Sequence, residues 1–316
     1  MNIIGPDALI FGVDDIEATT RFLTDYGLTP VNVGPRGGRF ETQEGTALII
    51  APKDDPSLPP LLPSGTSVRK MVYGVDTAAT VEAIAAELGK DREVRRLADG
   101  SIEAKDDNGF TLGFQVTVRR PLDLPAEAIN APGAAPQRAP NQCGVDVAAW
   151  PKPRTLGHFA AFSPDAAKAE AFYVNRLGFR VTDRLVGAGM FLQAGGTMEH
   201  HTLFLINTPP PMQGIEHIAF HMSGPNDVML AGTRFLNLGY QSFWGPGRHT
   251  FGSNWFWYFN SPLGCRFEFD ADMDLHDKTW VPREVPASAD ATQVYLFQHR
   301  EKWAPVGGPP PGKGGH

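Results

Sequence analysis

A carboxylate in an alternating stretch near the end of the second half of the chain is the first candidate for chemistry. In CRFEFDAD (265–272), alternation places the apolar side chains on one face of a strand and Glu268 with its charged neighbours on the other. The aromatic run NWFWYF (254–259) precedes this stretch, and the turn SPLG folds the two segments back alongside each other. Glu268 therefore either faces water or meets a ligand such as a metal ion in a pocket.

The elements that would position this carboxylate belong to a repeated unit. Each unit has an apolar strand, an acidic or Gly/Pro turn, an amphipathic helix and a glycine stop. After each helix come short β-like runs, such as HTLFLIN (201–207). The four units begin at ALIFGVDDIEATTRFLTDYGL (8–28), KMVYGVDTAATVEAIAAELGK (70–90), GHFAAFSPDAAKAEAFYVNRLGF (157–179) and EHIAFHMSGPNDVMLAGTRFLNLGY (216–240).

The helix-ending glycines give the repeat its length. Gly27 and Gly89 are 62 residues apart, and Gly178 and Gly239 are 61 residues apart. A left-handed helix cap suits glycine at all four positions. Two strand–helix–strands units make one α+β domain, so the chain is expected to form two domains of two units each.

Composition divides the chain further. Residues 120–140 are rich in Pro and Ala and poor in large apolar side chains, which is typical of a connection between domains. We expect a first unit pair over 1–118, a linker over 119–153, a second unit pair over 154–275 and a C-terminal tail over 276–316. The glycine- and proline-rich end, 307–316, is expected to be disordered.

Bulk properties exclude several classes of protein. The chain has 316 residues, 42% of them hydrophobic and 20% charged, which indicates a globular protein. Its net charge of −7 argues against nucleic-acid binding, and no apolar run is long enough for a membrane helix. Cys143 and Cys265 make neither a disulfide framework nor a cysteine-based zinc site. With no signal-peptide pattern at the start, the expected location is cytoplasmic.

Four units paired in two domains resemble the vicinal oxygen chelate superfamily, whose βαβββ modules pair into a cupped sheet that holds a metal. The second half is more specifically similar to the type I extradiol ring-cleaving dioxygenases of aromatic degradation. The motifs that carry this likeness are LGHFAAFSPD, HHTLFL, GIEHIAF, GPGRHTFGSNWFWYF and SPLGCRFEFD.

The resemblance implies that His158, His217 and Glu268 are metal ligands. Two imidazoles and one carboxylate on one face of a metal leave adjacent positions open, as in the facial triad of non-haem Fe(II) oxygenases. A catechol can then bind through both oxygens while O2 takes a remaining position. We therefore expect Fe(II), with Mn(II) as the second possibility, and a catechol and O2 as reaction partners. Family members are often oligomeric, so a homo-oligomer is also expected.

The same resemblance assigns three further pocket residues. His201 falls where the family keeps an acid–base histidine, and His249 and Tyr258 match its other two polar groups. Alternation lets only one of His200 and His201 reach the cup, and a register slip by one residue would exchange them; we expect His201. His201 would protonate a departing oxygen, His249 would hydrogen-bond the substrate, and Tyr258 would favour the catechol anion.

The first half is expected to lack a metal. Lys70, Gly113 and either Asp7 or Ala8 fall at the positions of the three ligands. Lysine and glycine cannot rebuild the site, so this half is predicted to be structural.

Aromatic residues near the proposed site favour a hydrophobic substituted catechol as substrate. They are Phe191, Phe243, Trp255, Phe256 and Trp257. The segment 294–305, which contains His299 and Arg300, could lie across the pocket mouth and weaken this preference. Two departures from the family stand out: Glu216 beside His217, expected to face away from the cup, and Phe251-Gly252 in place of a polar pair.

Two other functions remain open from the sequence. One is a non-oxidative metal enzyme, an isomerase, epimerase or thiol transferase, on the same scaffold. The other is a metal-free ligand-sequestering module, which would tolerate loss of His158. Metal content distinguishes the second from the rest, and O2 consumption distinguishes the first.

Overall fold

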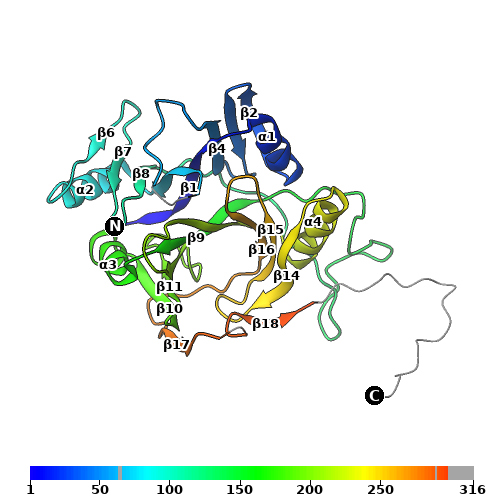
Figure 1. Cartoon of the computed structure of the whole chain (residues 1–316). Coiled ribbons are helices and arrows are strands. Elements are labelled where there is room, and N and C mark those ends of the chain that lie inside the picture. The colour runs from blue at the N-terminus through cyan, green and yellow to red at the C-terminus, as the bar shows by residue number, and fades with distance from the viewer. Residues whose placement is uncertain (63–65, 289, 298–316) are drawn as a thin grey trace, which may run out of the picture.

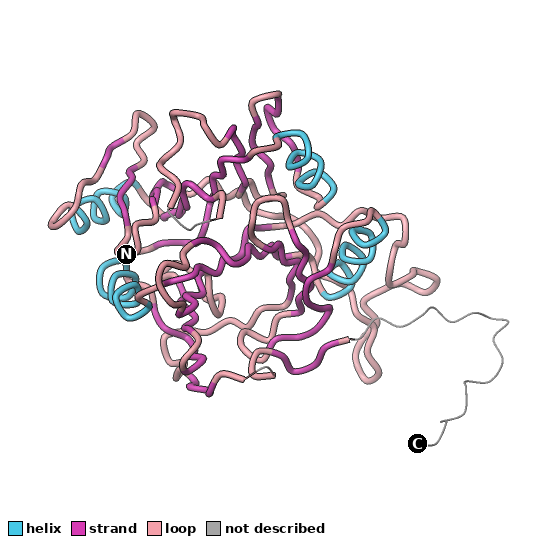
Figure 2. The backbone as a smooth tube through the Cα atoms, viewed as in Figure 1, coloured by secondary structure: helices cyan, strands magenta, loops and turns pink. Residues whose placement is uncertain are grey.

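A computed structural model shows the chain as two β-sheets with helices on their outer faces (Figures 1 and 2). It describes residues 1–62, 66–288 and 290–297. The expected disordered end and the residues His299 and Arg300 lie outside the described residues. Within the described part of the chain, no helix is long and apolar enough to cross a membrane.

The first sheet has eight strands in the order β2-β3-β4-β1-β5-β8-β7-β6. Its elements are β1 (Ile3–Val13), α1 (Ile16–Asp25), β2 (Thr29–Gly34), β3 (Gly37–Glu41), β4 (Ala47–Pro52), β5 (Val68–Val75), α2 (Ala78–Leu88), β6 (Arg95–Arg96), β7 (Ile102–Lys105) and β8 (Thr111–Val116). The stretch from β8 to β9, residues 117–154, contains no strand or helix.

The second sheet has ten strands in the order β17-β10-β11-β12-β9-β13-β16-β15-β14-β18. Its elements are β9 (Thr155–Ser163), α3 (Ala166–Ala171), the π-helical turn η1 (Phe172–Arg176), β10 (Arg180–Val186), β11 (Gly189–Gln193), β12 (Leu203–Asn207), β13 (Gly214–His221), α4 (Pro225–Asn237), β14 (Ser242–His249), β15 (Trp255–Asn260), β16 (Arg266–Ala271), β17 (Arg283–Pro286) and β18 (Gln293–Leu296).

Both sheets repeat one plan, which confirms the expected α+β architecture of paired units. In each sheet the first strands of the two units pair antiparallel at the centre, β1 with β5 and β9 with β13. Each of these four strands also pairs parallel with the last strand of its own unit, as β13 does with β16. Parallel neighbours need a long crossover connection, and in each unit this connection contains one helix and two further strands.

The C-terminal segment differs from the expected tail. β17 pairs parallel with β10 at one edge of the second sheet, and β18 pairs antiparallel with β14 at the other. Both strands are only four residues long, too short to stand out in the sequence as alternating runs. The segment therefore completes the second sheet at both edges.

The helix ends follow local sequence signals with one exception. Asp15, Thr77 and Asp165 cap α1, α2 and α3 by accepting a hydrogen bond from a backbone N–H of the first turn. Gly27, Gly178 and Gly239 have positive φ, as expected. The prediction was wrong for Gly89, which has a φ of −63°. Further backbone turns continue past it through residue 92, so no left-handed reversal is needed.

Helix α1 of the first half packs on the outer face of the second sheet. Tyr26, just past α1, stacks on Phe269 of β16 with ring centroids 4.0 Å apart. Phe22 of α1 meets Phe267 edge-on, with ring centroids 5.0 Å apart. The apolar face of β16 is thereby buried against aromatic rings, so its opposite face, which carries Glu268, must turn into the cup.

Candidate metal centre

One row of side chains runs across five strands of the second sheet. His158 of β9 lies opposite Ala219 of β13, and Ala219 lies opposite Glu268 of β16. Tyr258 of β15 is opposite Glu268, and Trp244 of β14 is opposite Tyr258. Directly paired residues share a face of a sheet, so these five side chains all enter the cup. The small side chain of Ala219 leaves room between the larger ones.

His217 lies two residues before Ala219 on the same strand and therefore on the same face. A bulge between Ile215 and His217 places Glu216 in the cavity wall as well. The expectation that Glu216 faces away was wrong because the bulge breaks the alternation at this point. Its carboxylate accepts a hydrogen bond from Nδ1 of His217 and pairs with Arg266.

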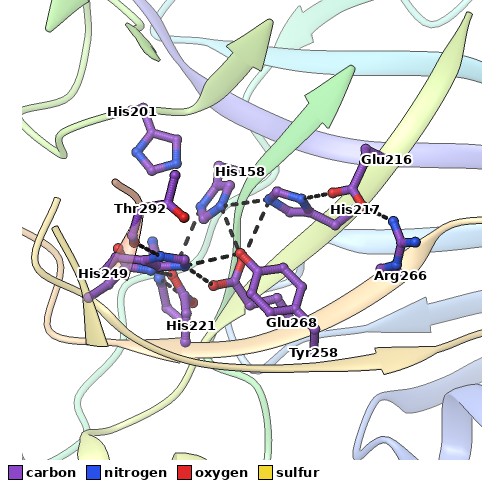
Figure 3. Close-up of polar contacts among 12 residues, drawn as sticks. His158, His201, Glu216, His217, His221, His249, Tyr258, Arg266, Glu268 and Thr292 are labelled. Carbon is purple, nitrogen blue, oxygen red and sulfur yellow. Dashed lines mark hydrogen bonds and ion pairs between the residues drawn. The ribbon is translucent and has the colours of Figure 1, made fainter. Parts of the chain in front are cut away.

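The three predicted ligands come together (Figure 3). Nε2 of His158 is 3.4 Å from Nε2 of His217, and Oε2 of Glu268 is 3.3 Å and 3.6 Å from these two nitrogens. Ligand atoms on one face of an octahedral ion with bonds of about 2.1 Å lie about 3 Å apart, so the set can close on a metal with small adjustments. Oε2 of Glu268 is buried and receives no hydrogen bond among the described residues. A buried carboxylate oxygen left in this way fits a metal ligand.

The surroundings act differently on the protonation of the three candidate ligands. Burial lowers the pKa of His158 despite the nearby carboxylates, so this imidazole is neutral. Burial alone would raise the pKa of Glu268, but its close contacts with His158 and His249, and the positive charge that His158 and His217 carry when protonated, hold it well below its usual range. Burial opposes the charge of His217, but Glu216, through its hydrogen bond and charge, outweighs it and raises the pKa of His217. A neutral His158 and an ionised Glu268 are thus favoured, whereas a metal would have to displace a proton that Glu216 helps His217 to hold.

The cavity above the triad has a volume of about 230 Å³. Its wall consists of polar groups around the triad and a larger set of aromatic rings. The lining residues are His158, Phe191, His201, Phe204, Ile206, Glu216, His217, Phe243, Trp244, His249, Phe251, Asn254, Tyr258 and Thr292.

Of the neighbouring histidines, His201 lines the cavity and His200 does not. The ring of His201 is 4.1 Å from that of His158, measured between centroids. Burial, together with charge from the surrounding imidazoles, places the pKa of His201 well below its ordinary value. The side chain that the sequence favoured is thus the one beside the triad, in its neutral form.

His249 and Tyr258 lie together beside Glu268. Nε2 of His249 is 3.1 Å from the hydroxyl oxygen of Tyr258 and 3.3 Å from Oε1 of Glu268. Nδ1 of His249 donates to the carbonyl oxygen of Thr292, 2.8 Å away. Burial and the charge of Glu268 raise the pKa of Tyr258 well above its ordinary value, so its hydroxyl keeps its proton. Thr292 was missed by sequence reasoning because it lies in the expected tail.

A second carboxylate, that of Asp270, lies behind His158. Oδ2 of Asp270 is 3.9 Å from Nδ1 of His158, and its Oδ1 accepts from Nδ1 of His221 at 2.7 Å. Asn254 also donates to Asp270, at 3.3 Å. Strand alternation puts Asp270 on the face of Glu268, which was the available signal for this residue. Outer carboxylates orient the ligand histidines of metal sites by accepting their second N–H, but at 3.9 Å Nδ1 of His158 makes no hydrogen bond within the described residues.

The aromatic residues expected near the site separate into two groups. Phe191 and Phe243 line the cavity, while Trp255, Phe256 and Trp257 do not. Among the described residues, no lysine or arginine lines the cavity. Additional rings come from residues that the sequence had not singled out as substrate contacts: Phe204, Trp244 and Phe251.

The corresponding place in the first sheet holds an ion pair. The strand registers put Ala8, not Asp7, at the position of the first ligand histidine. Gly113 falls at the position of the ligand glutamate, and Glu103 falls opposite it. Nζ of Lys70 bonds Oε1 of Glu103 at 2.6 Å, with both side chains largely buried. The first half therefore fills its cup with a salt bridge and offers no counterpart of the triad.

A protein-family model matches the part of the sequence that forms this site. Residues 155–269 match the model of the Glyoxalase/Bleomycin resistance protein/Dioxygenase superfamily. The match covers most of the second half of the chain and shows what that half is similar to. All three candidate ligands and the three polar residues beside them lie within the matched residues.

Two curated relatives are named a metapyrocatechase and an iron-dependent extradiol dioxygenase. Metapyrocatechase 2 of Cupriavidus necator is 33% identical over 155 residues, which cover 48% of this chain and 45% of the relative. An iron-dependent extradiol dioxygenase of Rhodococcus jostii is 28% identical over 157 residues, covering 46% of this chain and 50% of the relative. The aligned part thus spans about half the length of each relative.

Solved structures share the fold over nearly the whole chain. The Mn(II)-bound glyoxalase of Novosphingobium aromaticivorans superimposes with a TM-score of 0.71 at 21% identity, covering 92% of this chain and 90% of that one. Both halves of the chain therefore have the vicinal oxygen chelate fold. At this level of identity the likeness concerns the fold.

Proposed function

We propose that the protein cleaves the ring of a catechol outside its two hydroxyls, using O2 and a single Fe(II). The observation that carries the proposal is the buried triad His158, His217 and Glu268 with three further protonatable side chains against it. Those three are His201, His249 and Tyr258, and they match the family's acid–base set. The names of the two relatives support the same reaction.

The triad would hold the iron, and the rest of the cup would hold the substrate. When bound, Fe(II) supplies a site where a catechol and O2 meet and through which an electron can pass from ring to oxygen. This need for a redox-active ion favours iron over zinc, and Mn(II) remains the alternative. The aromatic wall excludes water and packs the two faces of a flat ring.

Two groups on opposite sides of the triad, Tyr258 and His201, can donate or accept protons during the reaction. Tyr258 keeps its proton, and its single hydroxyl hydrogen can be donated either to Nε2 of His249, 3.1 Å away, or to a substrate oxygen. On the other side, His201 stands beside His158 in its neutral form. It can take a proton from the catechol hydroxyl and later return it to the oxygen that departs during cleavage.

The substrate proposed is a catechol with a hydrophobic substituent. The wall contributed by Phe191, Phe204 and Phe251 is apolar, and Phe191 stacks on Phe204 with ring centroids 4.3 Å apart. Without a lysine or arginine among the described lining residues, a substrate carboxylate would be buried without a partner, at a cost of several kcal/mol. An aryl or alkyl substituent meets no such cost.

The test is anaerobic reconstitution with Fe(II) or Mn(II), followed by O2 uptake and product absorbance. The substrates are catechol, 3-methylcatechol, 2,3-dihydroxybiphenyl and a catechol carboxylate. His217→Ala and Glu268→Gln should abolish uptake, whereas Glu170→Gln, in a pair with Arg184 outside the cavity, should retain it. Metal binding without O2 uptake on any catechol would indicate a non-oxidative enzyme. No metal binding at all would refute the triad.

A further inference from the structure

A buried chain of hydrogen bonds extends from the cavity wall into the sheet behind it. Nδ1 of His201 is 2.9 Å from Nδ1 of its neighbour His200. Nε2 of His200 is 2.7 Å from Oδ2 of Asp183. Both His200 and Asp183 have no exposed surface, and neither touches the cavity. The proposed reaction assigns no role to either residue.

The donors and acceptors in this chain can be ordered in only one way when both rings are neutral. The carboxylate of Asp183 has only acceptors, so Nε2 of His200 carries the hydrogen and donates it. Nδ1 of a neutral His200 is then an acceptor, and the hydrogen between the two rings must sit on Nδ1 of His201. Nε2 of His201 is left with its lone pair, and it is the ring nitrogen remaining for the cavity.

Burial and neighbouring charges set the protonation states of Asp183 and His200. Burial would raise the pKa of Asp183, but hydrogen bonds from His200 and Arg283 lower it to about 2. Burial lowers the pKa of His200 in spite of Asp183 and Asp274, while charge from Arg283 acts in the same direction as burial. The carboxylate is therefore ionised and the ring neutral near pH 7.

The surrounding backbone fixes the position of both groups. The backbone N–H of Arg283 donates to Oδ1 of Asp183 at 2.7 Å, and Nε of Arg283 is 3.1 Å from both carboxylate oxygens. The main chain of His200 is held by two bonds: its N–H donates to the carbonyl of Asp274 at 2.9 Å, and its carbonyl accepts from Thr182 Oγ1 at 2.7 Å. Arg283 belongs to β17, so the C-terminal segment locks this chain in place.

We propose that Asp183 and His200 are positioning residues that hold His201 in the tautomer protonated at Nδ1, with Nε2 presented to the cavity as an acceptor. The role of His201 in the reaction rests on the proposed function, whereas its tautomer does not. In this form His201 accepts the first proton from a bound hydroxyl. When Nε2 has taken that proton, the Nδ1–H bond to His200 remains and the negative charge of Asp183 lies behind it.

Asp183→Asn is the decisive substitution, because the structure dictates how the new amide must sit. Oδ1 faces the backbone N–H of Arg283, a donor that cannot move away, whereas the guanidinium of Arg283 that also donates to Oδ2 is 39% exposed and can shift. The amide oxygen should therefore take the place of Oδ1. The amide nitrogen then faces His200 and donates to Nε2. The tautomer of His200 reverses, Nδ1 of His200 becomes the donor, and Nε2 of His201 becomes protonated.

The tautomers can be read directly by long-range ¹H–¹⁵N NMR on histidine-labelled protein reconstituted with diamagnetic Zn(II). Signals are assigned with His200→Leu and His201→Gln variants. We expect His201 to be protonated at Nδ1 in the wild type and at Nε2 in Asp183→Asn. Asp55→Asn, which alters a carboxylate paired with Arg36 on the surface, should leave the wild-type pattern. A wild-type His201 protonated at Nε2, or the same tautomer in Asp183→Asn, would overturn the proposal.

Activity of the Fe(II)-loaded enzyme provides the second readout. An amide in place of the carboxylate behind a catalytic histidine lowers kcat by about 10⁴ in the serine proteases through the wrong tautomer. With one more ring in between, we expect kcat to fall by at least about 100-fold while KM changes less than about threefold. If Asp183→Asn does not fold, His200→Leu, which removes the acceptor, should lower kcat in the same way. Wild-type kcat in a folded variant would refute the positioning role.

O2 consumption and the tautomer of His201 test ring cleavage and the positioning role separately. If the wild type consumes no O2 with any catechol but its His201 tautomer reverses in Asp183→Asn, ring cleavage is refuted and the positioning role stands. If the wild type cleaves catechols and the tautomer does not reverse, the positioning role is refuted and ring cleavage stands.

Discussion

Replacing Glu216 with Gln tests how the wall of the cup supports the metal. One carboxylate oxygen of Glu216 accepts from Nδ1 of His217, and the other pairs with a guanidinium nitrogen of Arg266. A glutamine has one oxygen for these two donors, so its amide nitrogen must face one of them. Arg266 is about a third exposed and can move, so the oxygen should stay on His217. The substitution then removes the charge behind the ligand and keeps its orientation.

The size of the effect follows from the loss of ligand basicity. Outer partners of this kind change metal affinity by about 10- to 100-fold, equivalent to about 1.4–2.8 kcal/mol. Glu216 also raises the pKa of His217, and protons compete with the metal for Nε2 below that pKa. The wild type therefore loses more affinity on acidification than the variant does. We expect the ratio of their dissociation constants to be largest near pH 8 and to shrink towards pH 6.

The measurement is a competition titration of Fe(II) or Zn(II) against a chelator of known affinity at both pH values. The Glu170→Gln control, which also breaks a glutamate–arginine pair, should bind metal like the wild type. Saturating metal should restore most of kcat in Glu216→Gln, because the substrate wall is intact. Equal dissociation constants for wild type and variant at pH 8 would refute the reasoning, as would a ratio that grows towards pH 6.

Three further outcomes are expected. Glu103→Gln leaves the largely buried ammonium of Lys70 without its carboxylate. Denaturant titrations should show the free energy of unfolding lowered by about 2–3 kcal/mol, with metal content unchanged. A loss below about 0.5 kcal/mol would contradict this prediction. Burial raises the pKa of Asp106 to about 6, so the native state binds the proton more tightly and ionisation costs stability as pH rises from about 4 to 7. The free energy of unfolding of Asp106→Asn, relative to that of the wild type, should therefore increase by up to about 3 kcal/mol across that range. A difference that stays constant with pH would contradict this prediction. Phe251→Ala removes part of the aromatic wall and should lower kcat/KM for an aryl-substituted catechol about tenfold more than for catechol itself; parallel losses would exclude a substituent contact.

Much of the site was predictable because it depends on repeated strand register. Side chains at equivalent points of two copies must enter the same cup, and His158, His217 and Glu268 occupy those points. The first half was predictable for the same reason, since Lys70 and Gly113 fall at matching positions. A period of two and a spacing of about 60 residues are enough to fix which side chains share a face.

What the sequence did not show depends on local breaks in that register. The bulge before His217 turns Glu216 inward, and nothing in GIEHIAF marks the extra residue. The contacts of Arg283 and Thr292 require two four-residue strands to return to opposite edges of the sheet. The bond between His200 and Asp183 joins residues whose pairing is set by side-chain packing across strands. None of these leaves a periodic pattern in the chain.

The stacking of Tyr26 on Phe269 indicates what the first half of the chain contributes to the site in the second half. Tyr26, the ring behind β16, belongs to the first half of the chain. One face of β16, the strand that carries Glu268, therefore lines the cavity, and the opposite face packs against the first half. An excised second half would expose Phe267 and Phe269 to water and free β16 to shift. The first half thus supports the strand of Glu268 from behind, and substitutions in α1 are expected to alter the geometry of a cavity that no residue of α1 lines.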